Sequence, residues 1–595
     1  MKPFDEYSAR LAQCTQNVAR LQRIQDRLVY ARLLVGLILA LVATAALGPQ
    51  WMSAWWLAPP AVALIILIAV HPGRERALQQ AKRSKAFYDR SLARLDNRWA
   101  GAGSQGEALR DPNHAYADDL DLFGRGSLFE LLSTARTATG ERTLASWLLT
   151  PGEHVEVTAR QAAVQEMSTR LDLREDLAVI GEDIRSALDD RRLAAWGARP
   201  HVHFFAGARW IALLLAAAAA VAAGAWLLGR TTLRPFFYVA VAEIFFAVSI
   251  RKQVGEITES VNTPARELRL IALLLERLER ESFQSPALLA LRARLTAKSN
   301  AGATQQILRL ERLVEWKEWA HNQIFAVVAA PLLWVPQFAM AIELWRQDCG
   351  PHIADWIAAV GEFEALGSLS VFLYERSDAV FPELLDSSEP RYQAVGLAHP
   401  LIALKEVVAN DVSLDVATPL WIVSGSNMSG KSTLLRAVGL SVVLAWAGAP
   451  VPARELRLSR LRIGASLRAN DSLADHKSRF YAEITKLKSI VDAAAAKQQV
   501  LFLLDELLSG TNSHDRRIGA EALIKGLLDH GAIGLATTHD LALAEIAESL
   551  GARAKNVHFE DQFESGAIAW DYQLRPGVVK RGNALELMRA VGLDV

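Results

Sequence analysis

The sequence predicts three kinds of structure: an α/β domain in the last third of the chain, an all-α region before it, and apolar helical hairpins. Short β-branched runs alternate with helical runs after Pro390, and alternating strand and helix builds parallel βαβ units. Apolar residues recur three and four positions apart between residues 119 and 190, which is the helical period. Long uncharged runs, such as Leu33–Gly73, indicate the hairpins.

The composition fits a chain with a sizeable folded core. Its 595 residues are 51% hydrophobic and 22% charged, which excludes a disordered or fibrous protein because such chains lack apolar surface to bury. The 65 basic and 65 acidic residues balance, so no overall charge draws the chain to nucleic acid or anionic lipid. Two cysteines, Cys14 and Cys349, are too few for a disulfide framework or a cysteine metal cluster.

Residues 1–115 are predicted to form a charged helix, an apolar hairpin and a linker. Gly48-Pro49-Gln50 divides the uncharged stretch into Leu33–Leu47 and Trp51–Val70, and a bilayer core requires ~20 apolar residues per helix. Basic residues flank both sides, so the positive-inside rule predicts a transmembrane hairpin with both ends in the cytoplasm. The alternatives are a buried soluble hairpin and a cleavable signal peptide.

A second hairpin is predicted within residues 201–254. Trp210–Gly229 has no charge, and Pro235–Ile250 contains Glu243 as its one charged residue. An acid within a membrane is costly unless it is paired or wet, and the loop between the segments carries Arg230 and Arg234. We expect this pair to enter the membrane as well, and a soluble helical hairpin is the alternative.

The remaining helical region is predicted to be soluble. Arg and Glu interleave between residues 256 and 320, a pattern typical of a solvated helix face. A third apolar stretch, Ile324–Trp345, contains Pro331 and Glu343. We expect it to be a buried core helix.

The first chemical motif follows a predicted strand at Trp421–Ser424. It is G-x-x-x-x-G-K-S between a strand and a helix, which predicts an α/β P-loop NTPase, whereas a chance match in a Gly-rich turn is the alternative. Its glycines let backbone N–H groups point at phosphate oxygens. Lys431 is expected to reach the β- and γ-phosphates of ATP, and Ser432 to ligate Mg²⁺. The predicted nucleotide-binding residues are Gly425, Ser426, Asn427, Met428, Ser429, Gly430, Lys431, Ser432 and Thr433.

A pair of carboxylates follows the apolar strand Leu501–Leu504. Asp505 at the strand end is placed to hold Mg²⁺ through water, and Glu506 to polarise the attacking water, which is typical of a nucleotide-hydrolysing site. His539 follows another predicted strand and is expected to sense the γ-phosphate or the water. Without the neighbouring motifs, the alternative interpretation is an ordinary loop histidine. The predicted catalytic residues are thus Glu506, Lys431 and His539, and the predicted metal ligands are Ser432 and Asp505.

Together these segments resemble the MutS family. Ser424–Thr433 resembles its phosphate loop, Asp505–Asp515 its acidic strand and the following loop, and Thr537-Thr-His539 its switch histidine segment. Ser478–Glu483 looks like its Ser-Thr-Phe-Met-x-Glu segment, with Arg479 in place of the usual Thr. The resemblance implies that Ser478 approaches the nucleotide of a partner subunit.

Other segments extend the resemblance to about residues 116–200 and 255–595. His399-Pro400 and Asn410 match the opening of the family's ATPase domain, and Thr139–Leu148 resembles the start of its core domain. The resemblance implies an all-α MutS core (lever) domain at 116–200 and 255–390 and an ABC-like ATPase domain at 391–595. Valines stand where the family often has an aromatic near adenine, so Tyr572 is the candidate for adenine stacking.

The departures from the family concern its DNA-reading parts. The apolar hairpins stand where the mismatch-reading domain and the DNA clamp are expected, and no helix-turn-helix or nuclease-like tail follows Leu593. The expectation is therefore a membrane-anchored MutS-related ATPase of the inner (cytoplasmic) membrane. About four transmembrane helices would keep the core and the ATPase domain together in the cytoplasm, since only an even number of spans does so.

The resemblance implies a homodimer that binds and hydrolyses ATP with Mg²⁺ and binds mismatched or branched DNA. Arg-rich helices are consistent with DNA binding; the arginines concerned are Arg266, Arg269, Arg277, Arg280, Arg292 and Arg294. The main alternative is an ATP-driven membrane machine that acts on a protein or lipid partner without DNA. The motor of a transporter is a weaker alternative, because no Leu-Ser-Gly-Gly-Gln-type segment is present.

Overall fold

The computed structural model describes residues 2–47, 51, 53–182, 188–296, 302–426, 429–467, 479–508, 512–539, 541–564 and 567–578. Contacts divide the chain into two compact units. Unit 1 comprises Met1–Leu132, Arg174–Val179 and Val371–Val595, and unit 2 comprises Ser133–Leu173 and Ile180–Ser370.

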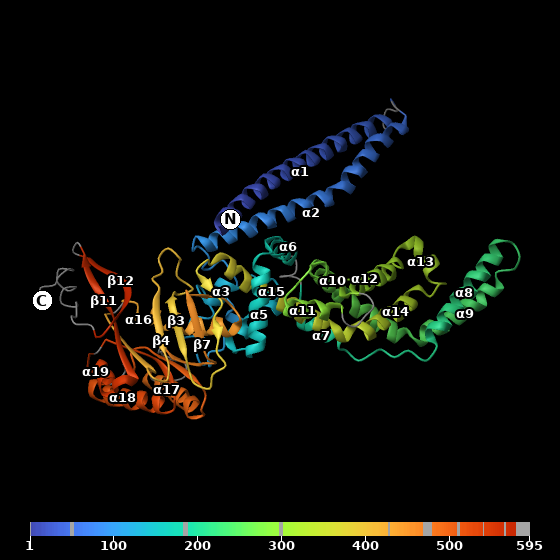
Figure 1. The fold of residues 1–595 in the computed structure, drawn as a ribbon. Helices are drawn as coiled ribbons and strands as arrows, with labels where there is room; N and C mark the ends of the chain where they lie inside the picture. The colour runs from blue at the N-terminus through green and yellow to red at the C-terminus, as the bar shows by residue number, and fades with distance from the viewer. Residues whose placement is uncertain are drawn as a thin grey trace. The chain divides into compact units, whose positions relative to one another are not determined.

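Unit 1 begins with a long helical hairpin (Figure 1). Its helices are α1 (Pro3–Leu47) and α2 (Ala58–Leu95), with a 3-10 turn at Ala54–Leu57 before α2. The predicted charged helix and the first apolar segment form one continuous helix, α1. Prolines occupy the first positions of α2, where a missing N–H removes no intrahelical bond.

The strands described in unit 1 form a six-stranded, a four-stranded and a two-stranded sheet. The large sheet has the order β12-β11-β5-β10-β9-β8. Strands β11 and β12 are antiparallel, and all other neighbouring strands in this sheet are parallel. Its strands are β5 (Leu420–Ser424), β8 (Arg462–Ser466), β9 (Val500–Leu504), β10 (Ile533–Thr538), β11 (Ala554–Glu564) and β12 (Ala567–Pro576). The strands predicted at residues 420–423, 501–504 and 533–537 are therefore confirmed as β5, β9 and β10.

The smaller sheets were not predicted. The four-stranded sheet has the order β2-β7-β3-β4, and β1 pairs with β6. The bounds are β1 (Ala379–Val380), β2 (Glu383–Leu384), β3 (Tyr392–Leu397), β4 (Asn410–Leu414), β6 (Val451–Pro452) and β7 (Glu455–Leu458).

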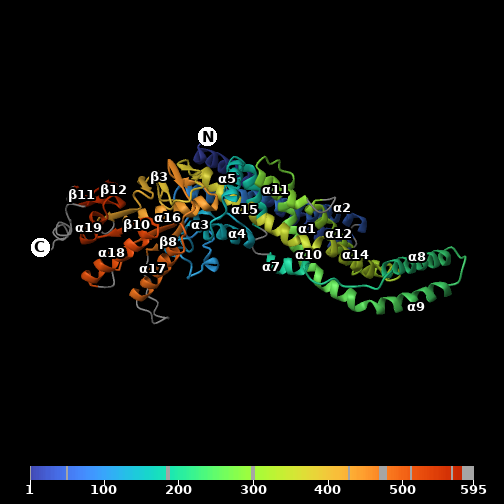
Figure 2. The same ribbon diagram turned by 60° about the horizontal axis from the view of Figure 1, so that its bottom comes forward.

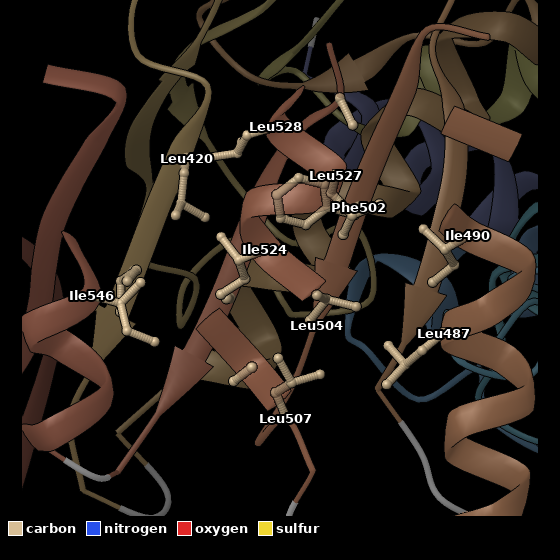
Figure 3. Close-up of a cluster of buried hydrophobic side chains, with 14 of the residues drawn as sticks. Leu420, Leu487, Ile490, Phe502, Leu504, Leu507, Ile524, Leu527, Leu528 and Ile546 are labelled. Atoms are coloured by element: carbon tan, nitrogen blue, oxygen red, sulfur yellow. The ribbon is translucent and has the colours of Figure 1, made fainter. Parts of the chain in front are cut away.

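Helices cover both faces of the large sheet. Unit 1 contains α3 (Leu128–Leu132), α16 (Lys431–Ala447), α17 (Arg479–Ala495), α18 (Ser513–Asp529) and α19 (Leu541–Leu550). Phe502 and Leu504 of β9 join side chains of α17, α18 and α19 in one buried cluster (Figure 3). Leu503 points to the other face, because successive strand residues alternate, and lies against Gly439 of α16, where a Cβ would come within 2.9 Å of its Cδ1.

The regular secondary structure described in unit 2 is all helical. Its helices are α4 (Ala138–Leu149), α5 (His154–Ser168), α7 (Asp190–Gly197), α8 (Ala208–Leu227), α9 (Arg234–Ser249), α10 (Arg251–Glu279), α11 (Pro286–Thr296), α12 (Ala303–Trp319), α13 (Gln323–Ala329) and α14 (Trp334–Cys349). Two further helices, α6 (Leu171–Gly181) and α15 (Ile353–Glu375), contribute residues to both units. Long helices α10, α12 and α14 run side by side (Figures 1 and 2).

Four helical stretches in the described part of the chain are long and apolar enough to cross a membrane: Pro3–Leu47, Ala54–Leu95, Ala208–Leu227 and Trp334–Glu375. The apolar windows of the first two are fully unburied, whereas 72% of the last is buried. The last stretch is therefore part of the core, because its apolar side chains already have protein partners. Helix α9, the second arm of the second hairpin, has 16 residues, short for a bilayer core of ~30 Å.

The third apolar stretch does not form one buried helix as predicted. It is split into α13 and α14 by a connection that includes Leu333, whose φ is +46°. Helix α14 is buried, for example at Ala339 and Ile342, but Ile324 and Val327 of α13 are exposed. The prediction was correct for α14 and wrong for α13, because Pro331 and the residues around it interrupt the helix.

A polar clasp holds the base of the α1–α2 hairpin within unit 1. Arg94 of α2 donates two hydrogen bonds to the carboxylate of Glu375, at 2.8 and 2.7 Å, and the hydroxyl of Tyr7 of α1 donates a third at 3.2 Å. Tyr88 donates to Glu175 of α6. Both tyrosines are fully buried, so these bonds form away from water.

Candidate functional site

The candidate site lies at the carboxyl ends of three adjacent parallel strands, β5, β10 and β9. Ser424 of β5 is opposite Thr538 of β10, and Ala536 of β10 is opposite Leu504 of β9. The segments that follow these strands are therefore neighbours, at the sheet edge where α/β proteins bind ligands. They are the predicted phosphate loop, the acidic pair and the segment with His539.

The loop after β5 is closely packed around two glycines. Gly425 and Gly430 have φ of +151° and +105°, which favour glycine. A Cβ at Gly425 would come within 2.7 Å of Ser429 Oγ, and that hydroxyl donates to the Ser426 carbonyl at 2.9 Å. Asn427 and Met428, also predicted to bind nucleotide, lie outside the described residues.

Helix α16 begins directly after this loop, at Lys431. Ser432 and Thr433 are in its first turn, where Ser432 is half-buried and Thr433 exposed. The first N–H groups of a helix lack intrahelical partners and carry a partial positive charge. This end of α16 therefore adds anion-binding groups to the loop.

Lys431 is folded into the loop. The residue is 5% exposed, and its Nζ donates to the carbonyls of Gly425 at 2.9 Å and Ser426 at 2.6 Å. A buried ammonium requires such partners because its desolvation is costly. The two carbonyls thus hold the positive charge at the centre of the loop.

One hydroxyl orders the acidic pair. Thr537 of β10 donates from Oγ1 to Asp505 Oδ1 and accepts a hydrogen bond from the N–H of Glu506 at 3.0 Å. Thr537 is buried, so these bonds are sheltered from water. In the sequence, Thr537 stands out only as part of the segment that ends at His539. Its role as the anchor of Asp505 follows from the pairing of β9 with β10.

Glu506 and His539 face one another across the strand ends. His539 Nδ1 lies 3.5 Å from Glu506 Oε1, and both side chains are accessible to solvent. Glu506 has φ of +46° and Leu508 φ of +55°, conformations that are costly for residues other than glycine and cluster at functional sites. The structure therefore brings together the predicted carboxylate and the predicted histidine.

The strained turn after β9 is held by a buried glutamate. Glu483 of α17 accepts a hydrogen bond at its Oε1 from the N–H of Leu508 at 2.7 Å. Glu483 closes the segment that begins at Ser478, which lies outside the described residues. The glutamate thus links α17 to the turn that carries Glu506.

Tyr572 is fixed beside the phosphate loop by Asn410. The Asn410 amide donates to the carbonyl of Tyr572 at 3.0 Å and accepts from the N–H of Leu574 at 2.7 Å. Tyr572 has φ of +52°, and a Cβ at Gly430 would lie 3.2 Å from its Cδ1. An aromatic ring therefore borders the loop, and Asn410 is a positioning residue whose role the sequence did not reveal.

His399 lies in a buried segment that Arg376 holds in place. Arg376 donates to the carbonyls of Pro400 at 3.2 Å and Ile402 at 3.1 Å. The N–H of Leu401 donates to His399 Nδ1 at 3.3 Å, which requires this nitrogen to be unprotonated. Burial, followed by the charges of Arg436 and Arg376, lowers the pKa of His399 to about 4.

The arginines considered for DNA contact are largely engaged with groups of unit 2. Four of them form ion pairs: Arg269 with Glu311, Arg277 with Glu281, Arg280 with Glu276 and Arg294 with Glu362. Arg292 donates to the carbonyl of Glu281 at 2.8 Å. The arginine pattern is thus mainly that of a salt-bridged helix surface.

Comparison with known proteins finds one family in both parts of the chain. Residues 116–404 match MutS domain III, and residues 421–594 match MutS domain V. Together the two matches span most of the chain. The first includes the α8–α9 hairpin, and the second includes the candidate site.

Individual relatives match a smaller part. The chain is 34% identical over 251 residues to the DNA mismatch repair protein MutS of Natronomonas pharaonis and 32% over 248 residues to that of Roseiflexus sp.. It is 36% identical over 197 residues to the DNA mismatch repair protein MutS 2 of Haloarcula marismortui. These alignments cover 41%, 40% and 33% of this chain but 28%, 22% and 20% of the relatives. The chain therefore spans less than a third of the length of these curated relatives.

Proposed function

The chain belongs to the MutS family, since two domain types of that family match most of its length, and we propose that it is a membrane-anchored ATPase that works on DNA as a homodimer. One observation carries the ATPase proposal. The phosphate loop, the acidic pair and His539 follow three adjacent strands and meet at one edge of the sheet.

The loop after β5 suits the phosphates of ATP. Gly425 leaves room for the tight turn, and the start of α16 supplies N–H groups that point along the helix axis toward the loop. Lys431 Nζ is already held at the loop by two carbonyls. These bonds are exchangeable for stronger, charge-assisted bonds to phosphate oxygens.

The hydroxyl of Ser432 and the carboxylate of Asp505 are hard oxygen ligands of the kind that Mg²⁺ prefers. The hydrogen bond from Thr537 fixes one oxygen of Asp505 and leaves the other available. Bound Mg²⁺ would neutralise charge on the β- and γ-phosphates. The protein's part is to hold the two ligands in place, Ser432 in the first turn of α16 and Asp505 at the end of β9.

Glu506 is the proposed base that orients water for in-line attack on the γ-phosphate. Its N–H is tied to Thr537 and its turn is tied to Glu483, so its position is fixed by two elements. His539, 3.5 Å from the carboxylate, is positioned to respond to the γ-phosphate. Phosphoryl transfer depends mainly on such positioning and electrostatics.

The homodimer and its composite site rest on the family. Ser478 would reach the nucleotide of the partner subunit, as the family resemblance implies. Tyr572, bordering the loop at Gly430, would stack on the adenine, because an aromatic ring offers a flat apolar face to a base.

Nucleotide binding is tested with the full chain in detergent and a fluorescent ATP analogue. Lys431→Ala should weaken binding more than about tenfold, because a charge-assisted hydrogen bond contributes roughly 1.5–3 kcal/mol. Lys488→Ala is the control, since Lys488 pairs with Asp492 on the surface of α17. Equal binding by both variants would refute the assignment of the loop.

Membrane anchoring is supported by the exposed apolar surface of the α1–α2 hairpin. Leu33 is 66% and Ile65 65% exposed, and no charged residue occurs between Leu33 and Gly73. Such a surface costs ~25 cal/mol per Å² in water. The α8–α9 hairpin is proposed to enter the same cytoplasmic membrane, with the catalytic site in the cytoplasm.

A carbonate wash tests membrane anchoring. The full chain should stay in the membrane pellet after an alkaline carbonate wash, and its release would contradict the proposal.

DNA as the partner is supported by the family and by relatives named DNA mismatch repair proteins. The full chain in detergent should bind duplex, mismatched or branched DNA, and higher salt should weaken binding because phosphate contacts release counterions. At least one of these DNAs should also change ATP turnover. The absence of both effects would refute a DNA role.

A second candidate is an ATP-driven membrane machine for a protein or lipid partner. It is favoured by the ion pairs that engage four of the six arginines considered for DNA contact. It predicts that lipid vesicles, rather than DNA, change the turnover.

A further inference from the structure

Helix α13 is a short helix of unit 2 that exposes apolar side chains to solvent. Ile324 is 87% and Val327 77% exposed, and Val328 is half-exposed. Its start is well defined, since Asn322 Oδ1 accepts hydrogen bonds from the N–H groups of Ile324 and Phe325 at 3.0 and 3.4 Å. An ordered helix with this surface requires an apolar partner to remove it from water.

Aromatic rings surround α13. Phe325 contacts Trp319 and Trp334, with ring centroids 6.1 and 4.9 Å apart, and Phe338 contacts Trp334 and Trp316 at 4.8 and 5.7 Å. Trp316 and Trp319 are themselves about half-exposed. Tryptophan favours the membrane–water boundary because its ring is apolar and its N–H is polar.

This surface is continuous with the base of the α8–α9 hairpin. Leu333, four residues beyond α13, packs in one buried cluster with Ala208 and Ala212 of α8 and Phe246 of α9. In Figure 1, α13 lies at the end of unit 2 where α8 and α9 attach. A bilayer that receives the hairpin would therefore reach α13 as well.

The charges around this base suit anionic headgroups. Arg209 lies in the first turn of α8, and Arg251 and Lys252 begin α10; all three are exposed. Glu318, the acid nearest to α13 along the chain, is paired with Lys317 at 2.8 Å and His321 at 3.2 Å. Basic residues beside an apolar segment are attracted to the negative cytoplasmic leaflet.

We propose that an interfacial patch, formed by Trp316, Trp319, Ile324, Val327 and Val328, lies in the boundary between headgroups and acyl chains of the bilayer. The proposal rests on the proposed membrane insertion of α8 and α9. In this position the patch sets the depth of the hairpin, and α9, with 16 residues, enters the bilayer without spanning it alone. The occupant of the patch is lipid, not a second protein.

The test places one fluorescent label at a time on the full chain. Cys14→Ser and Cys349→Ala remove the native thiols, and Val327→Cys carries an environment-sensitive label. Nanodiscs contain phosphatidylcholine and phosphatidylglycerol, with or without a spin label near the top of the acyl chain. Val155→Cys is the matched control, because Val155 is an apolar residue of unit 2 that is 80% exposed. Val221→Cys reports on α8 itself.

We expect the label at 327 to emit at shorter wavelength in nanodiscs, to be quenched by the spin-labelled lipid and to resist aqueous iodide. The label at 155 should behave as in water. If the label at 221 is quenched by lipid but that at 327 remains in water, the interfacial patch is refuted while the hairpin anchor stands. If both remain in water, the patch and the insertion of α8 are both refuted. Protection of 327 from iodide without lipid quenching would show a protein occupant and also refute the patch.

Discussion

Single polar groups decide the geometry of the candidate site. Thr537 joins Asp505 to the N–H of Glu506, and Asn410 holds the backbone on both sides of Tyr572. In each case one side chain forms hydrogen bonds with groups at least 31 residues away in the sequence. Loss of the Thr537 hydroxyl leaves the partly buried carboxylate of Asp505 and N–H of Glu506 without this partner, which is costlier than the loss of the bond itself.

Thr537→Val tests this arrangement, because valine keeps the shape and removes the hydroxyl. Asp505 and Glu506 should lose their common anchor, at a cost of roughly 1–3 kcal/mol, and ATP turnover should fall at least about tenfold. Steady-state turnover and nucleotide binding by the full chain are the measurements. Thr485→Val is the control, since the Thr485 hydroxyl bonds only to the Tyr481 carbonyl of its own helix among the bonds described. Unchanged turnover in Thr537→Val would contradict the anchor role.

The lowered pKa of His399 predicts that the folded protein loses stability in acid. Its folded pKa of about 4 lies below the ordinary value near 6.5, so the unfolded chain takes up the proton first as the pH falls. The contribution of this residue to stability is complete above pH ~6.5. It is lost progressively between that value and about 4, by an amount on the order of 3 kcal/mol.

Thermal unfolding at pH 7 and pH 5 measures this effect. The decrease in Tm on acidification should be smaller in His399→Gln than in the parent chain. An equal decrease in both would show that His399 does not titrate in this window.

The sequence predicted the residues of the phosphate loop and the acidic pair, but not the side chains that hold them in position. Patterns with fixed spacing include Gly425, Lys431, Asp505 and Glu506, so the sequence alone identifies these residues. Thr537 bonds to Asp505 because β10 lies beside β9, and that adjacency depends on the sheet order. The predicted roles of the site residues in binding and hydrolysis stay predictions.

Among the elements, the clasp at the base of the α1–α2 hairpin joins four helices through polar side chains. Its members come from α1, α2, α6 and the end of α15, and its Arg94–Glu375 pair is nearly removed from solvent. A buried ion pair is costly to form but far costlier to break on one side only. The clasp therefore holds the hairpin to unit 1.

Arg94→Met should destabilise this connection by roughly 3–5 kcal/mol, since it leaves the Glu375 carboxylate buried without its cation. Arg110→Met is a matched control, because Arg110 also makes two hydrogen bonds to one carboxylate, Asp118, at 2.7 and 2.8 Å but is half-exposed. It should cost no more than about 1 kcal/mol. Tm values in detergent and proteolysis of the hairpin base measure the difference; equal effects would contradict a structural role for the clasp.

The elements differ in how far the sequence predicted them. Strands β5 and β9 are buried along their whole length, so they read as continuous apolar runs. The small antiparallel strands, such as β4 with its alternation of buried and exposed residues, have weak patterns and were missed. The division between α13 and α14 was also missed, because composition makes Ile324–Trp345 one apolar run whereas the backbone at Leu333 breaks it.

In the whole molecule, segments that are far apart along the sequence belong to the same compact unit. The α1–α2 hairpin belongs to the same unit as the candidate site, although the pair formed by Tyr7 and Glu375 is 368 residues apart in sequence. Sequence periodicity carries no information on such long-range pairs. The sequence alone predicted a hairpin, a helical core and an α/β domain, and their grouping required the structure.

We propose that the two apolar hairpins and the candidate ATPase site work together as one machine. The hairpin of unit 1 exposes apolar residues over its outer half, and its base is clasped to the unit that carries the site. A change at the site on hydrolysis would therefore have a polar connection, through Arg94 and Glu375, to the proposed membrane anchor.

Glu506 is proposed to activate water for ATP hydrolysis in this chain. The measurement that tests this role is the steady-state ATP turnover of Glu506→Gln in lipid nanodiscs, compared with the parent chain at equal nucleotide occupancy. General-base catalysis contributes about 10²–10⁴-fold, so turnover should fall at least about a hundredfold while ATP binding is retained. Normal turnover by Glu506→Gln with nucleotide bound would show that Glu506 is not the base.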